Sequence, residues 1–413
     1  MTDHYDELEI REPAERERSL VKAVAAQVAH AKTHAPAYEQ LLKDVDPADI
    51  DSAEAIAKLP LTRKSALLEL QRENLPLGGF CTVSGPDLAY LFASPGPIYE
   101  PGSKRADFWR FARALFAAGF RPGNIIHNCF SYHLTPAGAM IDSGAHALGC
   151  TVIPAGVGQT ELQVQTIHDL QPDGYVGTPS FLKIILEKAA ELGTDVSSLK
   201  KALVSGEALP PTLRSIFGEQ GIACRQCYAT ADLGVIAYES EAEEGLIIDE
   251  GIYLEIVRPG TGEPLADGEV GEVVVTSLNP DYPLIRFATG DLSAILSGPS
   301  PCGRSNRRIK GWMGRADQTA KVRGMFIHPQ QIAQIIKRHD QINRARLVID
   351  WIDQRDEMVL QCEVEEPSEE TAHAVTESIR NVCKVRGSVE FVVIGTLPND
   401  GKVIDDIRNY DQA

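Results

Sequence analysis

Two short segments combine small residues with carboxylates in a way that suits nucleotide binding. Gly206-Glu207-Ala208 follows an apolar run and precedes a helix-like stretch that starts near Pro210. Such a junction lies at the carboxyl edge of a parallel sheet, where a flat adenine ring can lie against the main chain. Asp291 follows Thr289-Gly290 on a turn, and its carboxylate could accept hydrogen bonds from both ribose hydroxyls. An ordinary strand–helix turn and a turn-capping carboxylate are the plain structural alternatives.

The overall charge argues against one class of partner. The chain has 413 residues, 43% of them hydrophobic and 24% charged, with a formal net charge of −18. Such an acidic surface repels a phosphate backbone, so nucleic acid is not an expected partner, whereas a local pocket can still hold ATP. No run of about 18 apolar residues predicts a membrane span. Because the acidic start Met1-Thr2-Asp3-His4-Tyr5-Asp6 is unlike a signal peptide, we expect a cytoplasmic location and reduced cysteines.

The elements that would position these segments alternate between helix and strand from about residue 80 to 235. Apolar runs occur at 124–126, 150–154, 174–176 and 202–205, and helix-like stretches at 108–119, 137–148 and 181–192. This alternation predicts a parallel sheet covered by helices. Charged helical sequence precedes it up to about residue 75. Between about 246 and 298, alternating apolar residues and Pro-Gly and Asp-Gly turns predict antiparallel hairpins at the edge of the domain.

The last hundred residues have a pattern of their own. Apolar spacing changes in the order helix, strand, strand, helix, strand, which is typical of a small ferredoxin-like α+β module. A chain of this length also exceeds one compact core. We therefore predict an α/β protein with a large N-terminal α/β domain, residues 1–316, containing parallel sheets and an antiparallel edge subdomain. A small, mobile α+β C-terminal domain, residues 317–413, would follow.

The junction between these domains carries the most specific motifs. They are Gly314-Arg315-Ala316-Asp317, Lys321-Val322-Arg323-Gly324 and His328-Pro329-Gln330-Gln331-Ile332. In order and spacing, these motifs resemble the adenylate-forming ligases and, more narrowly, the phenylacetate–CoA ligases. The segments that extend the resemblance over nearly the whole chain are Gly206-Glu207-Ala208, Tyr228-Ala229-Thr230-Ala231-Asp232, Phe287 to Leu292, Leu397-Pro398 and Gly401-Lys402. The resemblance implies an enzyme that activates an acid with ATP and passes the acyl group to coenzyme A.

The resemblance also assigns nucleotide-binding residues. They are Gly206, Glu207 and Ala208 beside adenine, Tyr228, Ala229 and Thr230, and finally Asp291 and Arg315. Tyr228 would stack under adenine, and Asp291 would bind the ribose. Arg315 would reach the ribose and the α-phosphate, where a planar cation suits spread negative charge. Asp232 stands where the family has Glu and would position Mg²⁺ on the phosphates, although Asp is one methylene shorter and Ala229 replaces the usual Gly.

Further roles implied by the resemblance fall in the small domain. Lys402 would swing in to contact the carboxylate and the α-phosphate during adenylation, where a mobile point charge stabilises concentrated negative charge. Taken alone, Lys402 is typical of a solvated surface lysine. Asp317 would be the hinge on which the small domain rotates, with helix capping as its plain alternative. Arg323 and Gly324 would face coenzyme A, and AMP would bind between the two domains.

The acid pocket and possible metal sites carry weaker signals. Tyr132 and His133 align with a family segment that lines the acid, but packing of a buried aromatic is at least as good an interpretation. Cys224 and Cys227 invite a metal or redox interpretation, yet a strand would point the two thiols to opposite faces. Some relatives hold structural zinc with a Cys-Pro-Cys-Gly turn. The matching turn here keeps only Cys302, so we expect no structural zinc.

The phosphate loop departs from the family. A run of Ser, Thr and Gly followed by Lys-Pro normally cradles the β- and γ-phosphates. This chain reads Ala93-Ser94-Pro95-Gly96-Pro97-Ile98-Tyr99-Glu100-Pro101, with Glu100 where Lys would stand. A carboxylate about 4 Å from a phosphate charge costs roughly 4 kcal/mol at an effective dielectric of 20. Lys104 or Arg105 just downstream could supply the missing cation.

The leading hypothesis is an acid–CoA ligase that forms an acyl-adenylate from ATP and a small, aromatic or similarly compact carboxylic acid. Its cofactors would be ATP/AMP, Mg²⁺ and coenzyme A, and its acceptor coenzyme A or another thiol. An acyltransferase on the same fold, or a nucleotide- or CoA-binding protein that uses no ATP, is the alternative because of the altered loop. A homodimer stays open, and neither nucleic acid nor a membrane is an expected partner.

Overall fold

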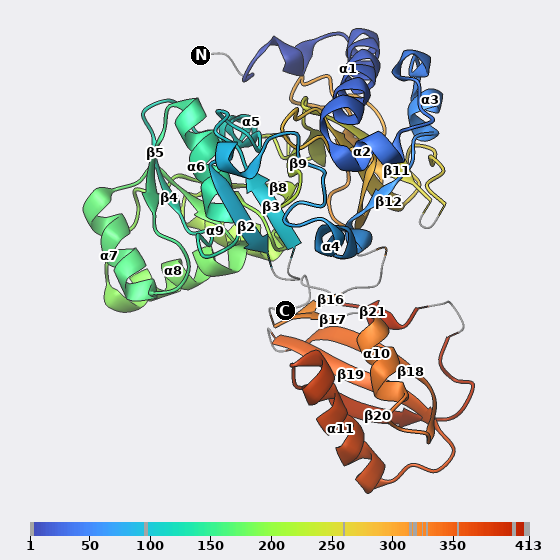
Figure 1. Ribbon diagram of the computed structural model, residues 1–413. Coiled ribbons are helices and arrows are strands. Elements are labelled where there is room, and N and C mark those ends of the chain that lie inside the picture. The colour runs from blue at the N-terminus through green and yellow to red at the C-terminus, as the bar shows by residue number, and fades with distance from the viewer. Residues whose placement is uncertain are drawn as a thin grey trace. The chain divides into compact units, whose positions relative to one another are not determined.

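The computed structural model describes residues 4–94, 98–258, 261–313, 316, 320–323, 325–327, 329–352, 355–398 and 402–408. The chain divides into two compact units, Met1–Met313 and Gly314–Ala413 (Figure 1). The domain bounds expected from the sequence, 1–316 and 317–413, stay a prediction. Among the described residues, no helix is long and apolar enough to cross a membrane.

The N-terminal part of the first unit is helical. It contains 3-10 turns at Glu7–Ile10, Pro47–Asp49 and Gly85–Asp87 and helices α1 (Pro13–His34), α2 (Pro36–Leu41), α3 (Ala53–Ala57) and α4 (Lys64–Glu73). Helix α1 begins at Pro13, whose fixed φ suits the first helical position, and Glu12 accepts a hydrogen bond from the main-chain NH of Glu15. One face of α1 buries Val21, Val24, Val28 and Ala31 in the core of the unit, which fixes the N-terminal helices on the unit.

A nine-stranded sheet, in the order β14-β15-β10-β9-β8-β7-β6-β4-β5, forms the centre of the first unit. Its parallel part contains β4 (Ile125–Asn128), β5 (Thr151–Pro154), β6 (Gly174–Gly177), β7 (Lys201–Val204) and β8 (Ala223–Thr230). Its antiparallel part contains β9 (Gly234–Tyr238), β10 (Leu246–Ile248), β14 (Ile295–Leu296) and β15 (Arg308–Ile309). The parallel sheet expected from the sequence is confirmed.

Helices between these strands cover both faces of the parallel sheet (Figure 1). They are α5 (Phe111–Ala117), α6 (Ala137–Leu148), α7 (Thr160–Leu170), α8 (Pro179–Leu192) and α9 (Pro211–Glu219). Cys224 and Cys227 of β8 belong to different hydrophobic cores, which confirms that the strand points them to opposite faces. Burial raises the pKa of each thiol to about 12, so neither is poised for redox or metal chemistry.

Helix α5 is shorter than the stretch 108–119 expected from apolar spacing. The backbone takes a left-handed conformation at Asp107 and Arg110, with φ of 49° and 64°. The Asp107 carboxylate accepts a hydrogen bond from the main-chain NH of Ala112 at 3.1 Å. The helix therefore begins at Phe111, because the residues before it form a turn that caps its first turn.

A second sheet of four strands, in the order β1-β13-β12-β11, packs in the same unit. It contains β1 (Thr62–Arg63), β11 (Ile252–Val257), β12 (Gly271–Ser277) and β13 (Phe287–Ser293). The antiparallel pairs β11–β12 and β12–β13 confirm the hairpins expected between residues 246 and 298. Strand β1 pairs in parallel with β13 and leads directly into α4. A separate hairpin is formed by β2 (Tyr90–Ser94) and β3 (Ile98–Gly102).

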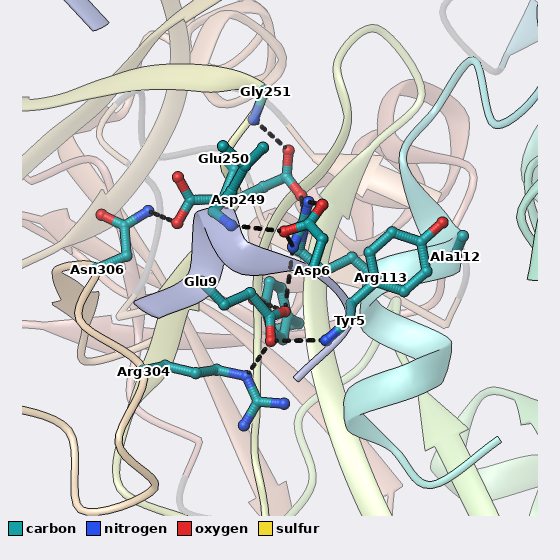
Figure 2. Close-up of polar contacts among 12 residues, drawn as sticks. Tyr5, Asp6, Glu9, Ala112, Arg113, Asp249, Glu250, Gly251, Arg304 and Asn306 are labelled. Atoms are coloured by element: carbon teal, nitrogen blue, oxygen red, sulfur yellow. Dashed lines mark hydrogen bonds and ion pairs between the residues drawn. The ribbon is translucent and has the colours of Figure 1, made fainter. Parts of the chain in front are cut away.

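A buried ion network holds the N-terminal segment onto the first unit (Figure 2). The Glu9 side chain is wholly buried, and its carboxylate pairs with Arg304 at 2.9 Å and with Arg113 at 3.2 Å. Tyr238 donates a hydrogen bond to the same carboxylate at 2.9 Å. Arg113 also donates to both carboxylate oxygens of Asp6, at 2.9 and 2.7 Å. The buried carboxylate of Glu9 therefore meets guanidinium groups, as a stable buried ion pair requires, and Arg113 links it to the partly exposed Asp6.

The network continues through the strand-rich side of the unit. Arg110 pairs with Asp249 at 2.9 Å. The Glu250 carboxylate receives Arg11 at 2.8 Å and Arg16 at 3.2 Å. Because these partners lie more than a hundred residues apart in the chain, the network joins helices α1 and α5 to the segment after β10.

Cys302 adjoins this network. Burial alone would raise the pKa of its thiol, but hydrogen bonds from Ser240, Ser300 and Arg304 lower the pKa below its ordinary value. The Ser300 hydroxyl lies 3.1 Å from the sulfur. The turn that relatives use for zinc is thus held here by hydroxyls and a guanidinium around one thiol.

The second unit confirms the helix–strand–strand–helix–strand pattern. It contains α10 (Pro329–Ile336), β18 (Ile342–Ile352), β19 (Arg355–Val364), α11 (Glu369–Cys383) and β20 (Ser388–Val392), preceded by the hairpin β16 (Ala320–Val322) and β17 (Met325–Ile327). A last strand, β21 (Ile404–Asp406), completes a sheet of order β20-β19-β18-β21. The α/β class with a separate α+β unit is therefore as the sequence predicts.

Candidate active site

Asp291 and Tyr228, expected from the sequence to bind ribose and adenine, lie together. Asp291 is on β13 of the four-stranded sheet and is 7% exposed, whereas Tyr228 is on β8 of the nine-stranded sheet. The Tyr228 hydroxyl donates to the Asp291 carboxylate at 2.7 Å. The indole NH of Trp312 donates to the other carboxylate oxygen at 3.1 Å. These two donors fix the orientation of the carboxylate where the two sheets meet.

The turn after β8 brings a second carboxylate to the same region. Asp232, the candidate Mg²⁺ ligand, has a fully buried side chain and pairs with Lys64 at 2.5 Å. Lys64 is the first residue of α4, directly after the strand that pairs with β13. Burial is the largest single influence and lowers the pKa of Lys64, but the charge and hydrogen bond of Asp232, together with the neighbouring carboxylates, outweigh it, so the pKa lies above its ordinary value. Glu100 and Asp291 also raise the pKa of Lys64, which places all four groups in one electrostatic cluster.

Glu100 contributes the third carboxylate of this cluster. It lies on β3 and is 1% exposed, and it accepts a hydrogen bond from the Ser94 hydroxyl at 2.8 Å. Burial raises its pKa to about 8, and the charge of Asp232 raises it further than Lys64 lowers it. The position at which the resemblance predicts a lysine is therefore a buried acid, and the cation of this cluster comes from Lys64.

Two buried oxygen atoms of the cluster have no hydrogen-bond partner among the described residues. They are Oδ1 of Asp232 and the hydroxyl of Tyr282. The charges of Asp232 and Glu100 both act on Tyr282 and, with its burial, hold its pKa well above the ordinary value. Buried polar atoms are normally satisfied. The unpaired atoms therefore mark a place built to receive another polar group.

The loop expected beside adenine has the geometry of a tight strand–helix junction. Gly206 takes a φ of +82°, a conformation that strongly favours glycine. The Glu207 carboxylate accepts from the main-chain NH of Ser180 at 3.3 Å, which ties this loop to the start of α8. Ala208 follows in the same loop.

Thr230, at the end of β8, accepts a hydrogen bond from the main-chain NH of Leu233 at 3.2 Å and so shapes the turn that carries Asp232. Ala229, the residue before Thr230 on β8, is half-buried against the hydrophobic core.

Tyr132, expected in the acid pocket, is held over the first turn of α6. Its hydroxyl donates to Asp142 at 2.7 Å and accepts from Asn128 at 2.7 Å. A Cβ on Gly138 would lie 2.7 Å from the Tyr132 ring, so the glycine makes room for this packing. Tyr132 and His133 are both exposed, and their role in binding the acid stays a prediction.

The segment after Tyr132 also contacts the hairpin that carries Glu100. The main-chain NH of Ala93, on β2, donates to the carbonyl of Leu134 at 2.8 Å. The segment that the sequence predicts to line the acid therefore lies next to the hairpin of β2 and β3.

The remaining candidates lie in the second unit. Lys402 donates to Asp405 at 2.9 Å, and half of its side chain is exposed. Arg323 lies in the turn between β16 and β17, where its main-chain NH donates to Asp356 at 2.8 Å. Arg315, Asp317 and Gly324 lie outside the described residues. The hinge and coenzyme A roles stay predictions.

Sequence reasoning missed Lys64, Trp312 and Tyr282. Lys64 and Asp232 are 168 positions apart, and neither Thr62-Arg63-Lys64 nor the start of α4 carries a local signal of nucleotide chemistry. The sequence pointed to Lys104 or Arg105 instead, and Arg105 donates to both carboxylate oxygens of Asp281 at 2.9 Å. The altered loop predicts that a cation must come from elsewhere, and the structure places Lys64 beside Asp232.

Known proteins resemble this chain in sequence and in fold. Residues 131–279 match the model of the AMP-binding enzymes. The phenylacetate–coenzyme A ligase of Escherichia coli strain K12 is 31% identical over 92% of this chain and 92% of its own length. The enzyme of the same name from Thermus thermophilus is 33% identical over 86% of this chain and 83% of its own length.

A solved structure is similar over nearly the whole fold. The 2-hydroxyisobutyryl-CoA ligase, in complex with 2-HIB-AMP and CoA, superposes with a TM-score of 0.81 at 24% identity and covers 99% of this chain and 93% of its own. The fold is that of an adenylate-forming enzyme. Within that class, the chain belongs to the phenylacetate–coenzyme A ligase family.

Proposed function

We propose that this protein is an AMP-forming acid–CoA ligase, which activates a small carboxylic acid with ATP as an acyl-adenylate and transfers the acyl group to coenzyme A. The contact between Tyr228 and Asp291, at 2.7 Å, carries the proposal. It joins a base-binding ring from one sheet to a ribose-binding carboxylate from another. The names of the relatives support an aromatic acid such as phenylacetate as the substrate.

Lys64 and Asp232 form the phosphate end of the proposed site. Lys64 supplies the cation that the loop lacks, and Asp232 holds its amine at 2.5 Å. Oδ1 of Asp232 is buried without a partner among the described residues, and a carboxylate oxygen is a ligand that Mg²⁺ prefers. No group of three His, Cys, Asp or Glu side chains that could hold a metal occurs in the described part of the chain. Asp232 would therefore share such an ion with the phosphates.

The chemistry proposed for these residues is electrostatic. Attack of the acid on the α-phosphate concentrates negative charge on phosphate oxygens, and fixed cations stabilise that charge in the transition state. Lys64 would act on the departing pyrophosphate. Lys402 would act on the acid and the α-phosphate in the adenylating half-reaction, with Arg315 on the ribose and α-phosphate. Arg323 and Gly324 would bind coenzyme A after a domain rotation about Asp317.

ATP–pyrophosphate exchange across a panel of aryl and short aliphatic acids tests the proposal, together with mass detection of the CoA thioester. We expect exchange with at least one compact acid, a thioester of that acid, and loss of both in Asp291→Ala. Thioester formation only from a supplied acyl-adenylate or acyl thioester would instead identify an acyltransferase. Nucleotide binding without any turnover would identify a nucleotide-binding protein that is not a ligase.

Substitution of Lys402 should affect the two half-reactions differently. Lys402→Ala should slow acyl-adenylate formation by about 10²–10³, while thioester formation from synthetic acyl-adenylate survives. Lys384→Ala, at the end of α11 in the same unit, is the matched control. Equal loss in both half-reactions of Lys402→Ala would contradict the assigned role.

A further inference from the structure

The chain shortly before Lys402 is fastened to the sheet of the second unit. The Arg344 guanidinium, on β18, donates to the main-chain carbonyls of Leu397 and Pro398, at 3.1 and 2.5 Å. The main-chain NH of Leu397 donates to the buried carboxylate of Glu363, on β19, at 2.9 Å. Arg344 and Glu363 lie opposite each other in the β18–β19 ladder. One cross-strand pair of charged side chains therefore holds Leu397 by both its NH and its carbonyl.

The chain shortly after Lys402 is fastened to the same strand. Asp405, on β21, pairs with Arg346, on β18, whose side chain is 6% exposed. Arg346 and Arg344 are two residues apart on one strand, so both side chains lie on the same face of the strand. Burial alone would raise the pKa of Asp405, but hydrogen bonds from Lys402 and Arg346 lower it below its ordinary value. Asp405 is thus an ionised carboxylate that a buried guanidinium holds in place.

The second oxygen of the Asp405 carboxylate meets Lys402. The Lys402 amine donates to Oδ1 at 2.9 Å, whereas Arg346 meets Oδ2. The side chain of Lys402 is 52% exposed and that of Asp405 20% exposed, so the lysine is open to a ligand while its partner is largely enclosed. An exposed ion pair contributes little where two mobile side chains must both be ordered. Here Arg346 already fixes the carboxylate, so the lysine is the side chain that the pair still has to order.

We propose that Asp405 is a positioning residue, which holds the Lys402 ammonium ordered for its contact with the acid and the α-phosphate during adenylation. This inference rests on the proposed function, because it takes Lys402 as the lysine of the adenylating half-reaction. An ammonium group has three N–H donors, so a bond to Asp405 is compatible with further bonds to oxygens of the acid and the α-phosphate. A lysine that is ordered before the reaction no longer loses its side-chain entropy in the transition state.

The variant Asp405→Asn tests this role and keeps a partner for the buried guanidinium. Its amide has a single acceptor oxygen, which Arg346 should take, so that the NH2 group faces Lys402. We expect the maximal rate of acyl-adenylate formation, followed by pyrophosphate exchange, to fall about tenfold, because ordering a lysine side chain costs about that factor. The KM for ATP should stay as in wild type, since the lysine acts in the transition state. Thioester formation from synthetic acyl-adenylate should also be unchanged.

A double-variant cycle shows whether Asp405 acts through Lys402. In the Lys402→Ala background, Asp405→Asn should cause no further loss of adenylation. Glu191→Gln is the matched control, because it alters an ion pair of the same spacing, Lys188–Glu191 on α8, and should leave exchange as in wild type.

Three outcomes would overturn the inference: wild-type exchange in Asp405→Asn, equal loss in both half-reactions, or the same loss with and without Lys402. Failure of the proposed function looks different. In that case wild type itself would form no acyl-adenylate with any acid of the panel, and the role of Lys402 would be refuted together with that of Asp405.

A further measurement needs no turnover. Brief reaction of the full chain with a lysine-acetylating reagent, followed by peptide mass spectrometry, reports how strongly each amine is held. Lys402 should be acetylated severalfold faster in Asp405→Asn than in wild type. Lys188, which keeps its partner Glu191, should react equally in both proteins. Equal acetylation of Lys402 in the two proteins would overturn the inference, because Asp405 would then not hold the amine.

Discussion

Two clusters of buried charge lie in the first unit, and they differ in how their charges are matched. Around Glu9, each buried carboxylate meets a guanidinium, and the side chains of Glu9 and Arg304 are almost wholly enclosed. Around Lys64, carboxylates outnumber the cation, and Asp232 and Tyr282 keep buried oxygens without partners among the described residues. Buried charges that are paired with each other stabilise a fold, whereas buried charges in excess of their partners are typical of sites that bind a ligand.

The difference also explains what each cluster joins. The Glu9 cluster ties an N-terminal turn to helix α5 and to the turn after Cys302, so its partners are all parts of the fold (Figure 2). The Lys64 cluster gathers residues from two sheets and a hairpin: Asp232 follows β8, Lys64 follows β1, and Glu100 and Asp291 lie within β3 and β13. We therefore expect substitutions in the first cluster to act on stability and substitutions in the second to act on nucleotide chemistry.

The largest effect is expected at Glu9. Glu9→Ala leaves Arg304 and Arg113 buried without this partner, and breaking a buried pair in this way costs about 3–5 kcal/mol. Denaturant unfolding should show that loss, while the AMP affinity of the remaining folded protein stays unchanged. Glu7→Ala, an exposed position of the same 3-10 turn, is the matched control and should be nearly neutral. A stable Glu9→Ala protein that has lost AMP binding would show that the Glu9 cluster acts on nucleotide binding and not on stability.

The next effect is expected at Lys64. Lys64→Met should lower ATP–pyrophosphate exchange by about 10²–10³, because it removes the cation from the phosphate end. It also strands the buried carboxylate of Asp232, so stability falls as well. The double variant Lys64→Met/Asp232→Asn removes that stranded charge and should regain stability without regaining exchange. Recovery of exchange in the double variant would mean that Lys64 only neutralises Asp232.

These two clusters also show what the sequence could predict. The parallel strands were predictable because short apolar runs alternate with helices and turn residues, and Gly206 and Asp291 stand out within that pattern. The Glu9 cluster was not predictable, since the start of the chain is typical of a solvated acidic segment until Arg113 and Arg304 are known to lie beside it. The departure from the family pattern at Glu100 was visible, but the burial of Glu100 and the position of Lys64 near it depend on how α4 packs. Pairs separated by more than a hundred residues leave no local pattern.

A smaller effect is expected on the pH dependence of the free energy of unfolding, through the buried carboxyl of Glu100. The pKa of Glu100 is about 8 in the folded chain, against an ordinary value of 4.5. The folded state then binds the proton that the unfolded state releases, so the stabilising contribution is complete at low pH and is lost as pH rises from about 4.5 to 8. The slope for one such group is at most about 1.4 kcal/mol per pH unit. The free energy of unfolding of Glu100→Gln should therefore fall less than that of wild type between pH 6 and 8. Parallel curves would show that Glu100 is ionised throughout.

The smallest effect is expected for the hydrogen bond from Trp312 that orients the Asp291 carboxylate in the cluster around Lys64. Trp312 donates its indole NH to Asp291 at 3.1 Å, and its side chain is nearly half exposed. Trp312→Phe keeps an aromatic ring and removes only this donor, so the loss should be that of one hydrogen bond to a carboxylate, about 1.5 kcal/mol or less, since the site is partly open to water. AMP affinity by calorimetry should fall by up to about tenfold, with no change in the free energy of unfolding beyond a few tenths of a kcal/mol. Trp351→Phe in the second unit is the matched control and should leave AMP affinity as in wild type. If Trp312→Phe instead binds AMP more tightly, the indole competes with the ribose for Asp291, and its role is to shield the carboxylate until nucleotide arrives.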